Sequence, residues 1–270
     1  MKSLRESVLL VSIMLGLIGP CYAEKMVIEG STTVLPIAQK AAEVFMSNDS
    51  AADISVRGGG SGVGIASIID GTCDIGDSSR SIKDSELDRA AVLGRDIKAH
   101  VVAMDGIAVI VNTENKVNAL SKKQLKDIYT GKISNWSQAG GDNQKIVVIS
   151  RDSSSGTFEA FGTLALDLAK VRSDALLQAS NQAVASIVAR TPGAIGYVGL
   201  GFMSGEVKAV EYEGVVPSKE TVLTGKYLLG RPLFMYTNGV PKGVVKEFID
   251  FVKSPEGQKL AEEEGFVALR

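Results

Sequence analysis

The sequence has few of the residues on which most enzymes and metal sites depend. Its 270 residues include one histidine, two cysteines and one tryptophan, and aromatic residues make up 6%. A Ser-His-Asp arrangement needs a positioned base, and His100 stands alone before a strand-like segment. One histidine and no spaced acidic loop also leave no recognisable zinc or calcium site. We therefore expect no catalysis, no metal and no cofactor.

An excess of basic charge is missing as well. The formal net charge is −2 at pH 7, so no broad cationic surface for nucleic acid is expected. The sequence also has no Gly-x-x-x-x-Gly-Lys-Ser/Thr loop, which excludes the common nucleotide-binding motif. Any anion site must therefore be local.

The longest apolar run stands at the start of the chain. Residues 8–18 are almost wholly apolar, follow Lys2 and Arg5, and precede a small-residue site that ends at Ala23. This pattern predicts a signal peptide over residues 1–23 and a location in the periplasm or cell envelope. The run is too short to span a bilayer comfortably. Lipid anchoring at Cys21 is the less favoured alternative, because Gly-Pro precedes it.

Short apolar strands alternate with helical patterns through the rest of the chain. Strands are expected near residues 26–28, 54–56, 74–76, 101–104, 107–111, 146–149, 194–198 and 233–236. Such alternation favours an α/β fold with largely parallel sheets. No Pro- or Ser-rich linker divides the chain, so two lobes that share chain crossings fit better than two consecutive domains. Cys73, alone after residue 23, is expected to be a buried core thiol.

Three turns share one chemistry. Residues 30–33, 58–62 and 153–157 each follow a strand, contain Gly with Ser or Thr, and precede a helix. A helix start presents unpaired N–H groups and partial positive charge, and Ser and Thr hydroxyls add donors. Arg151, directly before the third turn, adds a planar guanidinium that matches two oxygens of a phosphate. Because the carboxyl ends of strands gather ligands in α/β sheets, the three turns predict one anion site.

These segments resemble a known family. The segments that carry the resemblance span nearly the whole chain after residue 23. They are Gly-Ser-Thr-Thr at 30–33, Gly-Gly-Gly-Ser-Gly at 58–62, Asp-Ile-Gly at 74–76, Ile-Tyr-Thr-Gly-Lys-Ile-Ser-Asn-Trp at 128–136, Arg-Asp-Ser-Ser-Ser-Gly-Thr at 151–157, Pro-Gly-Ala-Ile-Gly-Tyr at 192–197 and Ser-Pro-Glu-Gly-Gln at 254–258. As a set they resemble the periplasmic phosphate-binding proteins of bacterial phosphate ABC transporters.

The resemblance implies a fold and a function. The fold would be that of two-lobed type II periplasmic binding proteins, with mostly parallel sheets joined by hinge strands. Residues 24–108 and 231–270 would form one lobe, and residues 109–230 the other. The protein would be a monomer that captures inorganic phosphate in the interlobe cleft and delivers it to an ABC permease. Alternatives are another tetrahedral oxyanion, such as sulfate or molybdate, or a phosphate sensor without a transporter.

The resemblance also implies the ligand-binding residues. They are Thr32, Thr33, Ser61, Ser79, Arg151, Ser155, Gly156 and Thr157. Where the best-known members have an aspartate that accepts the phosphate proton and repels sulfate, this sequence has Ser79. Asp77 or Asp105 are the alternative proton acceptors, so selectivity over sulfate stays open. Arg80 is expected in an outer position or at the surface, and less readily as a second cation of the site.

Overall fold

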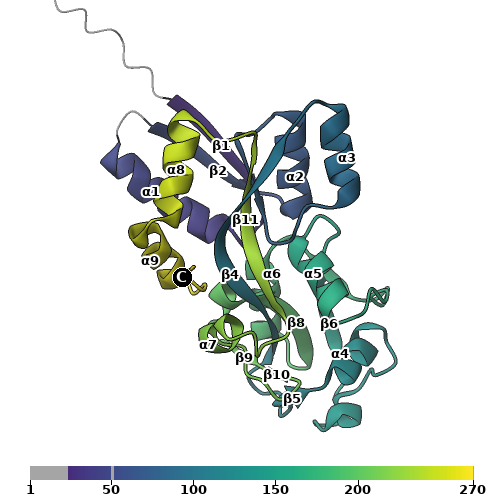
Figure 1. The fold of residues 1–270 in the computed structure, drawn as a ribbon. Helices are drawn as coiled ribbons and strands as arrows, with labels where there is room; N and C mark the ends of the chain where they lie inside the picture. Colours follow the sequence, from purple (N-terminus) through teal and green to yellow (C-terminus); the bar gives the residue numbers. More distant parts are fainter. Residues whose placement is uncertain (1–23, 50–51, 270) are drawn as a thin grey trace, which may run out of the picture.

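Strands and helices alternate along the chain in two lobes that are joined by two long strands (Figure 1). A computed structural model describes residues 24–49 and 52–269. The predicted signal peptide and Cys21 lie outside the described residues. The prediction of an α/β fold with two lobes is confirmed.

The first lobe, at the top of Figure 1, is a sheet covered by helices on both faces. Strands β1 (Glu24–Gly30), β2 (Ala52–Gly58) and β3 (Ile75–Ser78) run parallel. Helices α1 (Leu35–Asn48), α8 (Gly243–Lys253) and α9 (Pro255–Glu263) cover one face, and α2 (Ser61–Asp70) and α3 (Asp84–Val92) cover the other. Cys73 is buried in the second of these layers, as expected, and burial raises its pKa to about 12.

The second lobe repeats this design on a smaller sheet. Strands β6 (Val147–Arg151), β7 (Leu176–Gln178) and β8 (Ala194–Gly199) run parallel. Around them lie α4 (Lys122–Tyr129), η1 (Trp136–Ala139), α5 (Gly156–Leu164), α6 (Asn181–Arg190), η2 (Leu200–Phe202) and α7 (Lys219–Leu223). Strand β9 (Val207–Ala209) pairs with β4, and β5 (Ala119–Leu120) pairs with β10 (Glu211–Tyr212).

Two antiparallel strands connect the lobes. Strand β4 (Ile97–Asn112) pairs with β11 (Gly230–Asn238) in the first lobe and with β8 in the second. The nine strands of the described main sheet therefore run in the order β2-β1-β3-β11-β4-β8-β6-β7, with β9 beside β4. The sequence pattern predicts two separate strands here, near residues 101–104 and 107–111, with a break at Asp105. Instead Asp105 lies within β4, opposite Arg231 on β11, and this charged partner lets a buried carboxylate stay inside a strand.

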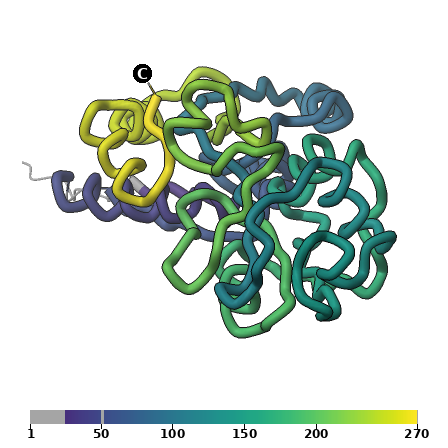
Figure 2. Tube along the Cα trace, turned by 90° about the horizontal axis from the view of Figure 1, so that it is seen from below, coloured from purple at the N-terminus to yellow at the C-terminus, as the bar shows by residue number. Residues whose placement is uncertain are grey.

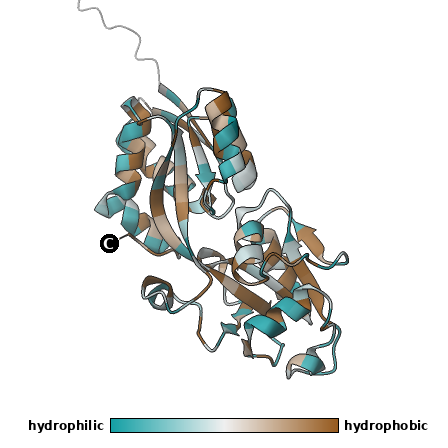
Figure 3. Cartoon of the chain, turned by 45° about the vertical axis from the view of Figure 1, so that its right-hand side comes forward, coloured by the Kyte–Doolittle hydropathy of each residue, from teal (hydrophilic) through white to brown (hydrophobic). Residues whose placement is uncertain are grey.

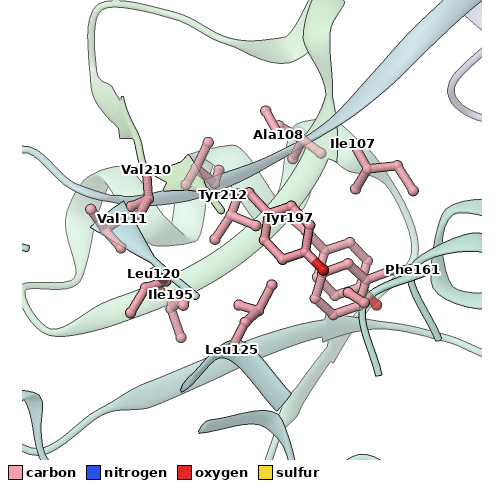
Figure 4. Close-up of a cluster of buried hydrophobic side chains, with 14 of the residues drawn as sticks. Ile107, Ala108, Val111, Leu120, Leu125, Phe161, Ile195, Tyr197, Val210 and Tyr212 are labelled. Atoms are coloured by element: carbon pink, nitrogen blue, oxygen red, sulfur yellow. The ribbon is translucent and has the colours of Figure 1, made fainter. Parts of the chain in front are cut away.

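Hydrophobic residues are frequent in the strands, and hydrophilic residues alternate with them along the helices (Figure 3). The buried side chains are mostly apolar. From below, α1 and the C-terminal helices lie side by side (Figure 2), and Phe45 packs edge-on against Phe248 with ring centroids 5.6 Å apart. In the second lobe, Phe161 and Tyr197 stack at 4.0 Å (Figure 4). Each lobe thus has its own core. The predicted lobe boundaries stay a prediction.

Within residues 24–49 and 52–269, no helix combines the length and the hydrophobicity needed to cross a bilayer.

Candidate functional site

The three predicted turns all lead into helices. Helix α1 follows the first turn, where the Ser31 hydroxyl accepts from the amide of Thr33 at 3.1 Å. Helix α2 begins at Ser61, after Gly60 with a φ of 99°. Helix α5 begins at Gly156, and the Ser155 hydroxyl caps it by accepting from the amide of Phe158 at 3.2 Å. Each first turn retains N–H groups without intrahelical partners, which suits an anion.

Arg151 is the last residue of β6 and is buried, with 1% of its surface exposed. Its Nε donates to the carbonyl of Gln178 at 2.9 Å, and its Nη2 donates to the carbonyl of Ala179 at 3.0 Å and to Thr32 Oγ1 at 3.2 Å. The third nitrogen, Nη1, is buried and has no hydrogen-bond partner among the described residues. A buried donor without an acceptor is costly, so Nη1 is suited to an acceptor supplied by a ligand.

The packing of β6 holds this guanidinium in place. The Tyr197 hydroxyl accepts from the Arg151 amide at 3.2 Å and lies 2.9 Å from Ser150 Oγ. The Tyr197 ring stacks on Phe161 of α5 (Figure 4), so Tyr197 of β8 contacts both β6 and α5. Burial raises the pKa of Tyr197 to about 12, which keeps the phenol neutral. Burial also lowers the pKa of Arg151, while nearby Asp152 opposes that shift.

The structure brings together the eight residues that the resemblance implied. Thr33 Oγ1 lies 3.0 Å from Thr157 Oγ1, although the two residues come from different lobes. Ser61 Oγ accepts from the amide of Ser79 at 2.9 Å and lies 3.3 Å from its hydroxyl. A methyl group on Gly156 would lie 2.2 Å from Ser61 Oγ, so only glycine allows this approach. Thr32 contacts the cluster because its hydroxyl accepts from Arg151 Nη2. Ser155 precedes Gly156 and caps α5 through its hydrogen bond with the Phe158 amide.

The two lobes are in contact around this cluster. The amide of Gly62, in α2, donates to the carbonyl of Ser154 at 2.9 Å, and Ser154 Oγ lies 3.0 Å from the carbonyl oxygen of Gly59. Thr33, Ser61, Ser79, Arg151, Ser155 and Thr157 are each at most 1% exposed. The site is therefore closed, and hydrogen bonds within it are little weakened by water.

Sequence reasoning missed two side chains of the cluster. Asn181, the first residue of α6, donates to Thr33 Oγ1 at 2.9 Å and to Thr32 Oγ1 at 3.3 Å. Arg231, near the start of β11, donates to Thr157 Oγ1 at 3.0 Å. The serine before Asn181 is a cap signal that could have pointed to a fourth helix start. Arg231 follows a glycine and precedes a proline, which gives no local sign of a site.

The two alternative proton acceptors have different surroundings. The Asp105 carboxylate accepts from Arg231 Nη2 at 2.9 Å and from the amide of Leu200 at 2.9 Å. The Asp77 carboxyl is 1% exposed, and neither of its oxygens has a hydrogen-bond partner among the described residues. It makes no hydrogen bond with the cluster, and burial raises its pKa well above the usual value. Neither carboxylate is hydrogen-bonded to the hydroxyls of the cluster.

The sequence pattern predicts Arg80 in an outer position or at the surface. Its side chain is instead buried, with 8% exposed. Its Nη1 and Nη2 form a two-pronged pair with the carboxylate of Glu86 at 2.8 and 2.7 Å. Its Nε lies 3.0 Å from Glu159 of α5, and Lys83 Nζ lies 2.5 Å from the same carboxylate oxygen. Arg80 therefore belongs to an ion cluster that joins the lobes beside the site, and its charge is already balanced.

The arrangement supplies hydrogen-bond donors and positive charge at one point. Among residues 24–49 and 52–269, no group of three or more His, Cys, Asp or Glu side chains is placed to hold a metal ion. Hydroxyls, helix-start amides and an unpartnered guanidinium nitrogen suit a small oxyanion.

Comparison with known proteins agrees with this geometry. A family model described as a PBP superfamily domain matches residues 19–256. The phosphate-binding protein PstS of Bacillus subtilis (strain 168) is 38% identical over 249 residues, which are 90% of this chain and 80% of that protein. The phosphate-binding protein PstS of Staphylococcus aureus (strain USA300) is 36% identical over 254 residues, 89% of this chain and 77% of that protein.

Solved structures have the same fold. A phosphate ABC transporter substrate-binding protein from Clostridium perfringens with bound phosphate superposes with a TM-score of 0.85 at 32% identity, covering 92% of this chain and all of the other. An ABC-type phosphate transport receptor from Vibrio cholerae superposes with a TM-score of 0.75 at 32% identity, covering 90% of this chain and all of the other.

Proposed function

Because this chain belongs to the PBP superfamily and, within it, to the family of PstS phosphate-binding proteins, we propose that it captures inorganic phosphate between its two lobes for an ABC transporter. Members of this family are substrate-binding proteins and not enzymes, and the chain is accordingly a binding protein.

One observation carries the proposed site. Arg151 Nη1 is a buried cationic donor without a protein acceptor, and it belongs to the cluster that holds hydroxyls and helix starts from both lobes. We propose that phosphate oxygens accept from Arg151, from the Thr32, Ser61 and Thr157 hydroxyls, and from backbone amides in the turn before α1 and at the starts of α2 and α5. Six to ten such donors, each worth about 1.5–3 kcal/mol to a charged group, suffice for micromolar binding against the cost of association.

The remaining expectations follow from this role. Ligand contacts from both lobes favour the closed form, and the closed shape would dock on a membrane permease. A protein with this role would act as a monomer in the periplasm or cell envelope after removal of residues 1–23. We propose residues 24–108 with 231–270, and 109–230, as the two lobes, since the apolar cores separate near these limits.

The function is tested by titration calorimetry of phosphate into wild-type protein and into Arg151→Gln. Wild type should bind one phosphate per chain. The variant should bind about 10- to 100-fold more weakly, because it loses a charge-assisted hydrogen bond of about 1.5–3 kcal/mol. Arg190→Gln is the matched control, since Arg190 is exposed at the end of α6 and should leave the affinity unchanged.

Absence of binding heat with phosphate in the wild-type protein would contradict the function. Equal weakening by Arg151→Gln and Arg190→Gln would leave phosphate binding intact but would remove Arg151 from the site.

A further inference from the structure

Arg231 is a second buried guanidinium in the cluster. It is 4% exposed, and its Nε and Nη2 bind Asp105 Oδ2 at 3.1 and 2.9 Å. Its other contacts go to residues of the proposed site: Nη1 donates to the carbonyl of Ser79 at 3.2 Å, and Nη2 donates to Thr157 Oγ1 at 3.0 Å and Thr33 Oγ1 at 3.4 Å. Arg231 thus connects the carboxylate of β4 to hydroxyls from both lobes.

These contacts determine which way the hydroxyl protons point. A hydroxyl has one proton to donate and two lone pairs to accept with, whereas Arg and the Asn amide nitrogen only donate. Thr33 Oγ1 accepts from Asn181 and Arg231, so its own proton goes to Thr157 Oγ1. Thr157 Oγ1 then accepts from Thr33 and Arg231, and it has no further partner among the described residues. Its proton is therefore left for a ligand.

Two carboxylates near the cluster, Asp105 and Asp152, are already engaged, and the carboxyl of Asp77 makes no hydrogen bond with the cluster. Asp105 accepts from Arg231 and from the amide of Leu200. Asp152 Oδ1 accepts from the amide of Ser154 at 2.9 Å and from its hydroxyl at 2.5 Å. The hydroxyls of Ser61 and Ser79 can accept a ligand proton, but they can equally donate to a ligand oxygen.

The charges around the cluster favour a doubly negative ligand. Arg231 contributes to the lowered pKa of Arg151, after burial and against Asp152, so the two guanidiniums repel each other. Asp105 is ion-paired with Arg231, whereas Arg151 forms no ion pair among the described residues and is only near Asp152. Other charged or titratable groups on the elements around this region are Asp77, Arg80, Lys83, Glu86, Glu159 and Tyr197. His100 hydrogen-bonds Thr237 on β11 instead. Because attraction grows with ligand charge, a dianion relieves the repulsion more than a monoanion.

We propose that Arg231, held by Asp105, is a specificity-determining residue that makes Thr157 a donor to the ligand, leaves the pocket without a carboxylate that accepts a ligand proton, and favours doubly charged tetrahedral anions, so that it binds the phosphate dianion and sulfate alike. This inference rests on the proposed phosphate site and names the ionic form that the site selects.

The test is calorimetry of phosphate and of sulfate at about pH 6 and about pH 8, with the purified protein. Since the guanidiniums stay charged at both values, phosphate affinity should rise with the fraction of dianion. Sulfate, fully ionised at both, should bind with unchanged affinity and within about tenfold of the phosphate dianion. Sulfate that fails to bind, or phosphate affinity that is constant or falls with pH, overturns the inference alone. If phosphate does not bind at either pH, the proposed function itself is wrong.

Variants separate Arg231 from a purely structural role. Arg231→Met combined with Asp105→Asn removes the charged pair together, which avoids an unpaired buried charge. This variant should lose at least about tenfold in affinity for both dianions and flatten the pH profile of phosphate. A profile as steep as that of wild type contradicts the role of Arg231.

A second pair of variants keeps the inference testable if that double variant does not fold. Ser79→Asp introduces a carboxylate acceptor, and Ser79→Asn is its uncharged control of similar size. Ser79→Asp should weaken sulfate at least about tenfold more than phosphate, while Ser79→Asn should weaken both alike. If Ser79→Asp weakens sulfate no more than phosphate, as Ser79→Asn is expected to do, the wild-type pocket does not lack a carboxylate acceptor in the way proposed.

Discussion

Asp77 is the residue whose side chain is least expected where it is found. It lies on β3, between β1 and β11, and its buried carboxyl has no hydrogen-bond partner among the described residues. Burial raises its pKa well above the value of a free aspartate. The folded state therefore holds the proton more tightly than the unfolded state does, and ionising the group opposes folding.

This pKa shift gives Asp77 a defined effect on stability. Because the pKa is raised in the folded state, no stability is lost below the unfolded pKa of about 4, and stability falls as the pH rises toward the folded pKa. Asp77→Asn should therefore raise the midpoint of urea unfolding at neutral and alkaline pH, and the gain should shrink toward pH 4. Asp53→Asn, at an exposed position of β2, is the control. A gain in Asp77→Asn that does not depend on pH would show that the carboxyl is already ionised at low cost.

At the scale of elements, glycine decides how closely helices approach the sheet. Gly64 of α2 faces β1 and β3, and a methyl group there would lie 2.5 Å from the carbonyl oxygen of Glu29 and 2.7 Å from that of Asp77. Gly162 of α5 has no atom within 4 Å of the same position. Gly64 therefore allows α2, whose first turn borders the site, to pack closely against the strands. Gly162 has no packing reason to be glycine.

The two helical glycines make a matched pair for mutation. Gly64→Ala should lower the free energy of unfolding by about 1–3 kcal/mol, because backbone on both sides must shift. Gly162→Ala should raise it by up to about 1 kcal/mol, because alanine favours the helix. Urea unfolding of each variant measures both changes. A loss of stability in Gly162→Ala would mean that α5 needs its glycine for a reason other than space.

At the scale of the whole molecule, the lobes touch through more than the anion site. Glu159 of the second lobe is shared by Arg80 and Lys83 of the first, and its side chain is 20% exposed. These ion pairs form only when the lobes are together, so they add to the stability of the closed form without touching the proposed ligand. Partly exposed pairs of this kind contribute about 0–1 kcal/mol.

Removing this interlobe pair should weaken binding indirectly. Glu159→Gln should lower phosphate affinity by up to about fivefold at low salt, and by less at high salt, where ion pairs are screened. Glu206→Gln, at an exposed position of the second lobe, should have no effect. Calorimetry at two ionic strengths measures both variants. A loss that persists at high salt would point to a packing role for Glu159.

Local patterns along the chain predict much of this structure. The order of strands and helices and the three helix starts depend on neighbouring residues, and these were predicted from periodicity, glycine and capping residues. Ser155 illustrates this, because a hydroxyl before a helical pattern caps it wherever the helix lies. Arg151 was found for the same reason, since it directly precedes such a turn.

Only the tertiary structure decided the partners of buried charges. Arg231 lies 74 residues from Thr157 and 126 from Asp105 in sequence, and nothing near it in the chain indicates either contact. The unbroken course of β4 through Asp105 depends on that same pair. A buried charge is tolerated where a distant strand supplies its counterpart, and strand order is set by packing of the whole chain. The sequence therefore predicts Arg151 and the hydroxyl donors of the site, whereas the hydrogen-bond network of Arg231 and Asp105 that orients them depends on the tertiary structure.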